Sequence, residues 1–183
     1  MTGPLGVHNA HQRALPVPAA RVGALLDRMG RPGDPLWPAP DWSPMVLQGP
    51  LAVGVKGHHG PIRYHVSRYL PGREIEFTFA AGVGVRGTHT LTVEPTGPQA
   101  CVLRHDVTGR LHGPMLAVWP LAMCWLHNAC VEDLLDRAET VLGTGPARPR
   151  RWSRWVRLLR RAGSIRSAVP VTVPVSSESG ATR

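Results

Sequence analysis

The feature that most constrains the fold is a change of hydrophobic period along the chain. Between residues 51 and 111, apolar and polar residues alternate in short segments separated by turns that contain Gly or Pro. This alternation is typical of antiparallel strands with one buried face and one wet face. From Pro114 to Leu142 the apolar residues recur at helical spacing instead. The sequence therefore predicts a sheet followed by one long helix, with a kink at Pro120.

The segments before residue 51 predict less regular structure. Residues 6–15 predict a first strand, and the spacing of Val22, Leu26 and Met29 predicts a helix after it. Residues 31–50 are rich in Pro and Trp, which indicates either a short second helix or an ordered loop. Trp residues in this loop would cap the domain or gate its interior.

Together these segments predict an α+β domain. We expect a curved antiparallel sheet of about seven strands wrapped around the long helix, with one or two short helices after the first strand. His58 and His59 fall between two expected strands and are interpreted as an exposed turn. The expected strands cover residues 6–15, 51–56, 62–70, 73–79, 85–94 and 99–111.

The formal net charge of +9 is concentrated near the C-terminus. Residues 1–145 hold 12 basic and 11 acidic residues, whereas residues 146–183 hold 9 arginines and only Glu178 as an acid. The nearly neutral first part argues against a basic nucleic-acid-binding domain. We therefore divide the chain into a domain at 1–145 and a basic tail at 146–183.

The tail contains an amphipathic segment at 150–162, and residues 164–183 are expected to be disordered. Tryptophans among arginines suit an anionic membrane surface, but an acidic partner, phosphate contacts or a solvated tail remain alternatives. The residues expected to contact a membrane or partner are Arg150, Arg151, Trp152, Arg154, Trp155 and Arg157.

Cysteine usage and the N-terminus indicate the compartment. The three cysteines show no metal-binding or redox spacing, which indicates free thiols in a reducing environment. The first ten residues do not resemble a signal peptide. An uncharged run at 111–131 raises the alternative of a membrane span, but its apolar part at 115–126 is short for one. We expect a cytoplasmic protein whose tail lies at the inner face of the membrane.

Three stretches carry a resemblance to a known superfamily. They are residues 86–95 (RGTHTLTVEP), 103–111 (LRHDVTGRL) and 125–139 (WLHNACVEDLLDRAE). Over roughly 5–143, the chain resembles the helix-grip superfamily, called SRPBCC or START-like, in its polyketide cyclase/dehydrase-like branch. The resemblance implies an apolar cavity between sheet and helix that binds a hydrophobic small molecule such as a lipid or polyketide. It carries over no catalytic residue, because this fold hosts binding proteins, transfer proteins and enzymes.

Three histidines are placed to face such a cavity. His89 and His105 share strand faces with apolar residues, and His127 lies close to the apolar stripe of the long helix. They could anchor a polar group of a ligand, act as general acids or bases, or bind zinc. Their positions on separate elements give the zinc reading no support, so no metal is expected. The expected lining is Tyr64, Phe77, Phe79, His89, Leu91, Leu103, His105, Trp119, Met123, His127 and Cys130.

The sequence contains no motif for a nucleophile or a cofactor. The glycine string at 82–87 follows a strand but opens no helix, which excludes a dinucleotide site, so no cofactor is expected. Two hypotheses remain. The chain binds or transports a hydrophobic small molecule without chemistry, or it is a polyketide cyclase/dehydrase-like enzyme in which His89, His105 and His127 transfer protons.

Overall fold

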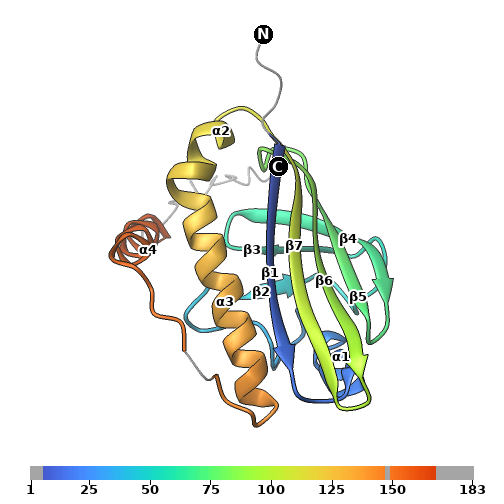
Figure 1. The fold of residues 1–183 in the computed structure, drawn as a ribbon. Helices are drawn as coiled ribbons and strands as arrows, with labels where there is room; N and C mark the ends of the chain where they lie inside the picture. Colours follow the sequence, from blue (N-terminus) through green and yellow to red (C-terminus); the bar gives the residue numbers. More distant parts are fainter. Residues whose placement is uncertain (1–5, 147–148, 168–183) are drawn as a thin grey trace, which may run out of the picture.

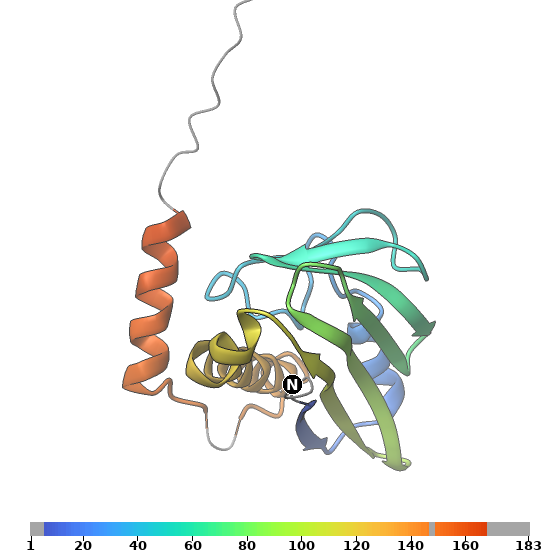
Figure 2. The same ribbon diagram turned by 90° about the horizontal axis from the view of Figure 1, so that it is seen from above.

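The computed structural model describes residues 6–146 and 149–167. Within these residues seven antiparallel strands form one curved sheet, and a long helix crosses its concave side (Figures 1 and 2). The strand order across the sheet is β1-β7-β6-β5-β4-β3-β2. The strands are β1 (Gly6–Leu15), β2 (Met45–Leu47), β3 (Lys56–His59), β4 (Ile62–Leu70), β5 (Glu74–Phe79), β6 (Val85–Gly97) and β7 (Ala100–Leu111). The helices are α1 (Ala19–Leu26), α2 (Met115–Val118), the π-helical turn η1 (Trp119–Met123), α3 (Cys124–Val141) and α4 (Arg154–Ser167).

The alternating pattern of the sequence sets the two faces of the sheet. In β6, His89, Leu91 and Val93 are buried on the concave side, and in β7 Leu103 and His105 are buried beside them. β1 pairs with β7 along its whole length and completes this side of the sheet. The predicted helix-grip α+β architecture is therefore confirmed, including the strand face that carries two of the three candidate histidines.

The start of the sheet differs from the prediction. The expected strand at 51–56 is wrong, because the chain forms β2 inside the Pro- and Trp-rich segment and β3 only from Lys56. The rest of residues 31–50 is an ordered loop, and it contains no second helix. Gly57 belongs to β3 and does not end a strand. A Cβ there would lie 2.6 Å from the Leu47 side chain and 2.9 Å from that of Tyr64. Only a glycine leaves room here for the neighbouring strands β2 and β4. Because glycine adds no apolar side chain to the alternating pattern, the sequence did not predict β3 at this position.

The long helix is continuous from Met115 to Val141, but it changes its winding at Pro120. Proline has no amide hydrogen to donate and cannot continue the ordinary helical bonding pattern. The backbone widens there into η1, and the amide of Cys124 donates to the Trp119 carbonyl five residues back. The predicted irregularity at Pro120 is thus a π-helical turn.

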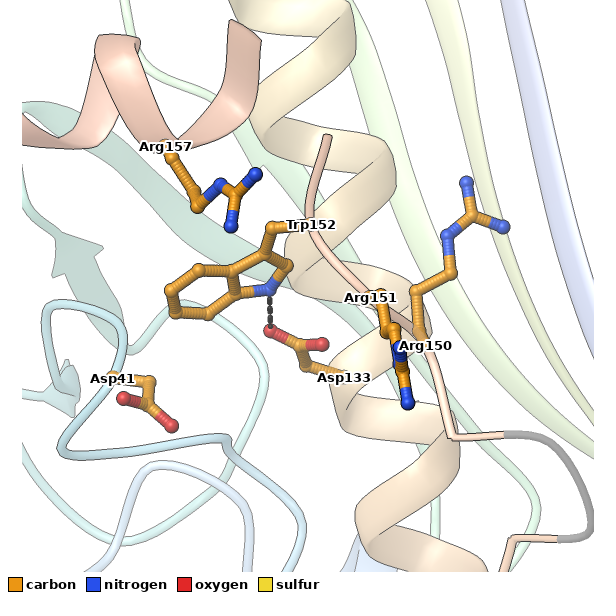
Figure 3. A pocket seen from close by; sticks show the side chains of 6 residues that line it. All are labelled: Asp41, Asp133, Arg150, Arg151, Trp152 and Arg157. Atoms are coloured by element: carbon orange, nitrogen blue, oxygen red, sulfur yellow. Dashed lines mark hydrogen bonds between the residues drawn. The ribbon is translucent and has the colours of Figure 1, made fainter. Parts of the chain in front are cut away.

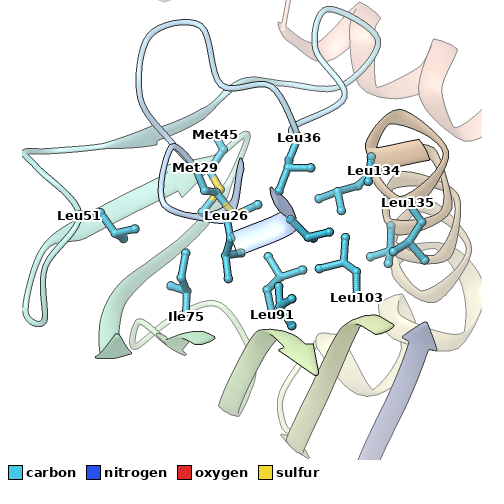
Figure 4. Packing of buried hydrophobic residues seen from close by; sticks show 14 of the residues in the cluster. Leu26, Met29, Leu36, Met45, Leu51, Ile75, Leu91, Leu103, Leu134 and Leu135 are labelled. Carbon is cyan, nitrogen blue, oxygen red and sulfur yellow. The ribbon is translucent and has the colours of Figure 1, made fainter. Parts of the chain in front are cut away.

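Aliphatic side chains fill the concave side between α1, the following loop and the C-terminal half of α3 (Figure 4). Leu26, Met29 and Leu36 are fully buried in this cluster, and Leu134 and Leu135 enter it from α3. This part of the interior is packed core.

An ionic cluster fastens α3 to the edge strand β1. The Arg13 guanidinium contacts Glu132 at 3.1 Å and Asp136 at 3.0 Å, and it also pairs with Glu139. These three carboxylates are spaced i, i+4 and i+7, so they lie on one face of α3. All four side chains are largely buried.

Candidate functional site

Five histidines from five elements meet inside the fold. Their rings come from four strands of the sheet and from the helix that crosses it. They are His11 in β1, His59 in β3, His89 in β6, His105 in β7 and His127 in α3. The sheet curvature brings these residues together although up to 116 positions separate them in the chain (from His11 to His127).

The five rings form one series across the interior. The ring centroids of His11 and His127 are 6.2 Å apart, and those of His127 and His105 are 5.1 Å apart. The series continues from His105 to His89 at 5.8 Å and from His89 to His59 at 6.4 Å. These separations leave each ring in contact with its neighbours without a direct hydrogen bond between rings.

Aromatic side chains surround the middle of this series. The rings of Phe77 and Phe79 stack on His89 with centroids 4.8 and 5.0 Å away, and the ring of Tyr64 meets its edge. The Tyr64 hydroxyl also lies 3.2 Å from Nδ1 of His59. At the other end, Trp119 of η1 lies beside His127 with centroids 6.0 Å apart.

Burial keeps the inner imidazoles neutral. Burial, together with a smaller effect of neighbouring histidines, lowers the pKa of His59 to about 4 and that of His127 to about 3. The pKa values of His89 and His105 are also lowered well below the usual range, chiefly by burial. Neutral imidazoles can both donate and accept a hydrogen bond. Across residues 6–146 and 149–167, no three His, Cys, Asp or Glu side chains are arranged to hold a metal ion.

His11 differs from the other four because it has a carboxylate partner. Its Nδ1 lies 2.7 Å from Glu132 of α3, and its Nε2 lies 3.1 Å from the side-chain oxygen of Asn128. Arg13 holds the other oxygen of Glu132. The carboxylate therefore fixes the His11 ring at the end of the series nearest the β1 edge.

The structure brings together most of the predicted lining but not all of it. Tyr64, Phe77, Phe79, Trp119 and the three predicted histidines meet in the ring contacts above. Leu91 and Leu103 belong to the packed aliphatic cluster. Met123 is partly exposed at the end of η1. Burial raises the pKa of the Cys130 thiol, which keeps it protonated.

Sequence reasoning missed two members of the series. The interpretation of His58 and His59 as an exposed turn is wrong, because both lie in β3 and His59 faces the interior. The signal was present, since His59 is two residues from Gly57 and shares its face. His11 was assigned to a strand but not to the site, and only the pairing of β1 with β7 reveals that it lies opposite His105.

The tail folds back onto the domain, where it contacts α3 and the loop before β2 (Figures 1 and 3). The indole N–H groups of Trp152 and Trp42 both donate to one oxygen of Asp133, at 2.8 and 2.7 Å. The Arg160 guanidinium lies 3.6 Å from the centre of the Trp152 ring, and it also donates to the Asp41 carbonyl. A surface hollow of about 400 Å³ lies here, lined by Asp41, Asp133, Arg150, Arg151, Trp152 and Arg157.

The tail helix α4 spans Arg154–Ser167, which overlaps the amphipathic segment expected at 150–162. Trp152 points to Asp133 in Figure 3, so it is part of the contact with the domain. The expected disorder at 164–183 overlaps the end of this helix, and its remainder, 168–183, lies outside the described residues. In the part of the chain that the structure describes, no helix is long and apolar enough to cross a membrane.

No known family profile matches the sequence, and no curated protein matches it either. Solved structures do match the fold. Norcoclaurine synthase from Thalictrum flavum superimposes with a TM-score of 0.59 at 14% identity, covering 76% of this chain and 87% of that one. A START superfamily protein from Mycobacterium smegmatis gives 0.53 at 14% identity, with coverages of 73% and 98%.

CalU16 from Micromonospora echinospora gives a TM-score of 0.53 at 12% identity, covering 91% of this chain and 98% of that one. These identities are too low to transfer a function, and the likeness shows the fold alone. The chain therefore has the START-like helix-grip fold.

Proposed function

We propose that the chain binds a hydrophobic small molecule between sheet and helix, and that the interior histidines anchor an oxygen of that molecule. The proposal covers lipids, polyketides and similar compounds with an apolar body and a hydroxyl or carbonyl group. It includes a carrier role, in which the molecule is bound and released unchanged.

The observation that carries the proposal is a set of buried nitrogen atoms without a partner. Nε2 of His89, Nδ1 of His105 and Nδ1 of His127 are buried and find no hydrogen-bond partner among the described residues. A buried polar atom left without a bond costs about 1–3 kcal/mol. A ligand oxygen, or a water molecule in its place, would recover this energy.

The structural neighbours support the class of ligand. One of the matching norcoclaurine synthase structures contains dopamine and hydroxybenzaldehyde, which are small aromatic molecules with hydroxyl groups. The rings of Phe77, Phe79 and Tyr64 around His89 suit a similar flat, apolar body here.

The test uses two forms of one probe. Naphthol and naphthalene share an apolar body, and only naphthol carries a hydroxyl. We expect the purified full-length protein to bind naphthol more tightly, as measured by fluorescence titration. His105→Leu should weaken naphthol binding about tenfold by removing one anchor, whereas His105→Gln should retain most of it. Equal affinity for the two probes would contradict the anchoring role.

A second candidate is the enzyme of the polyketide cyclase/dehydrase type, and the His11–Glu132 pair favours it. A carboxylate-held imidazole beside a series of neutral imidazoles can accept and return a proton. Gln substitutions separate the two functions, because glutamine can hydrogen-bond but cannot carry a proton at neutral pH. Under the enzyme hypothesis, turnover of a candidate polyketide should fall about 100-fold in His105→Gln or His127→Gln while binding persists. His65→Gln, on the outer face of β4, is the matched control.

We also propose that the arginine-rich tail lies on an anionic membrane at its cytoplasmic face. Arg150, Arg151, Arg154 and Arg157 are exposed. This position would suit a carrier that collects or delivers a lipid.

A further inference from the structure

We propose that α2, η1, the first turn of α3 and α4 together form one surface that lies on an anionic lipid bilayer. The inference rests on the proposed membrane contact of the tail and goes further. It extends the membrane contact to the long helix of the domain. It also places Trp152 in the contact between tail and domain, away from the membrane.

The long helix exposes an apolar stripe near its start. Val118, Leu121 and Trp125 are all exposed and lie just before, within and just after η1. Leu121 is 64% exposed and Trp125 is 48% exposed. Exposed apolar side chains grouped on a surface are typical of sites that contact a membrane or another protein.

The tail helix extends this stripe. α4 runs across the long helix, and its first turns lie beside the first half of that helix in both ribbon views (Figures 1 and 2). The indole N–H of Trp155 donates to the Leu121 carbonyl at 3.0 Å, so the two apolar faces adjoin. Trp155 is 44% exposed and Leu158 is 56% exposed.

Both tryptophans on this surface are suited to a membrane interface. The Trp125 indole donates to the Pro120 carbonyl, and the Trp155 indole donates to the Leu121 carbonyl. Each ring therefore presents an apolar body whose polar atom is already satisfied by the protein. Such rings settle at the level of the lipid headgroups, between water and hydrocarbon.

Arginines border the apolar part on α4. Arg154, Arg157 and Arg161 surround Leu158 at helical spacing, and together these four side chains line a shallow hollow. The sequence holds no Asp or Glu from 112 to 131 or from 140 to 177, so no acid on either segment offsets this charge. A positive rim with an apolar centre fits an anionic bilayer.

The opposite face of α4 is already occupied. Val156 is buried against the domain, and Arg160 stacks on Trp152 and reaches the Asp41 carbonyl. The helix is thereby held with its arginine and leucine face outward. A nucleic acid would use the arginines alone, whereas the exposed Leu121 and Leu158 favour lipid.

The experiment measures co-sedimentation of the full-length protein with vesicles. One set contains phosphatidylcholine alone, and the other has phosphatidylglycerol as one lipid in three. We expect binding only to the second set. Arg157→Gln/Arg161→Gln should weaken it about 30-fold, which corresponds to about 1 kcal/mol for each arginine. Leu121→Ser/Leu158→Ser should weaken it at least tenfold without changing the charge.

The matched control is Arg63→Gln/Arg73→Gln, which removes the same charge from exposed positions in β4 and in the turn before β5. It should bind like the native chain. Equal losses in both arginine pairs, or no loss in the leucine pair, would overturn the surface. Capture of RNA in place of vesicles would also overturn it. Naphthol titration of the same variants measures ligand binding by the interior histidines. The ligand-binding proposal and the membrane-surface proposal are therefore tested independently.

Discussion

The buried histidines should make the protein unstable in weak acid. In the unfolded chain a histidine binds a proton near about pH 6.5, whereas in the native fold the pKa of His59 is about 4 and that of His127 is about 3. Below about pH 6.5 the unfolded state therefore binds more protons than the native state, and the free energy of unfolding falls as the pH falls.

The size of this effect follows from the pKa values of His59 and His127. Each group lowers the free energy of unfolding by about 1.4 kcal/mol per pH unit until its native pKa is reached. Between about pH 6.5 and about pH 5, His59 and His127 together should cost about 4 kcal/mol, and His89 and His105 act in the same direction. This is a large part of the stability of a typical domain, which is about 5–15 kcal/mol.

Urea unfolding followed by circular dichroism, repeated from neutral pH to about pH 5, measures the effect. His127→Gln removes one of the depressed groups, so its free energy of unfolding should fall less steeply, by about 1.4 kcal/mol per pH unit. His65→Gln should follow the native slope. A native slope near zero in this range, or an unchanged slope in His127→Gln, would show that the imidazoles are not held neutral by the fold.

Three further changes test other parts of the structure. Gly23→Ala should destabilise the fold by about 2 kcal/mol or more in thermal unfolding, because the new Cβ would lie 2.3 Å from the Gly72 carbonyl oxygen; normal stability would mean that α1 can shift. Arg13→Gln should cost about 1–3 kcal/mol in urea unfolding by leaving three α3 carboxylates without their shared cation. Asp133→Asn should weaken the acceptor for two indole N–H groups and speed proteolysis between α3 and α4, and an unchanged cleavage rate would argue against this contact.

Most of the fold could be predicted from the sequence because each strand has one face buried in the core and one facing water, which makes apolar and polar residues alternate. Leu103 and His105 alternate with Arg104 and Asp106, and the structure buries the first pair and leaves the second partly exposed on the other face as an ion pair. The pattern gives no sign of β3 because a buried position of that strand holds a glycine, Gly57. Gly57 contributes no hydrophobicity to the pattern, although its lack of a side chain is what lets β2 and β3 approach.

The candidate site could be predicted only in part. His89, His105 and His127 stand among apolar residues within their own elements, so local patterns place them. His11 is brought in by pairing with a strand more than ninety residues away, which no local pattern encodes. The position of α4 depends on Trp42 and Asp133, and neither belongs to the tail.

The ionic cluster at Arg13 makes the two sides of α3 mechanically unequal. Along β1 the helix is fixed by three ion pairs at successive turns. On its other side it meets the loop before β2 through aliphatic packing around Leu36 and through two single hydrogen bonds, from Arg137 to the Pro35 carbonyl and from Trp42 to Asp133. If the fold opens to exchange a molecule with its surroundings, α3 would stay attached to β1 and separate from this loop. This loop contacts Trp152 and Arg160 of the tail, so exchange would occur next to the surface that we assign to the bilayer.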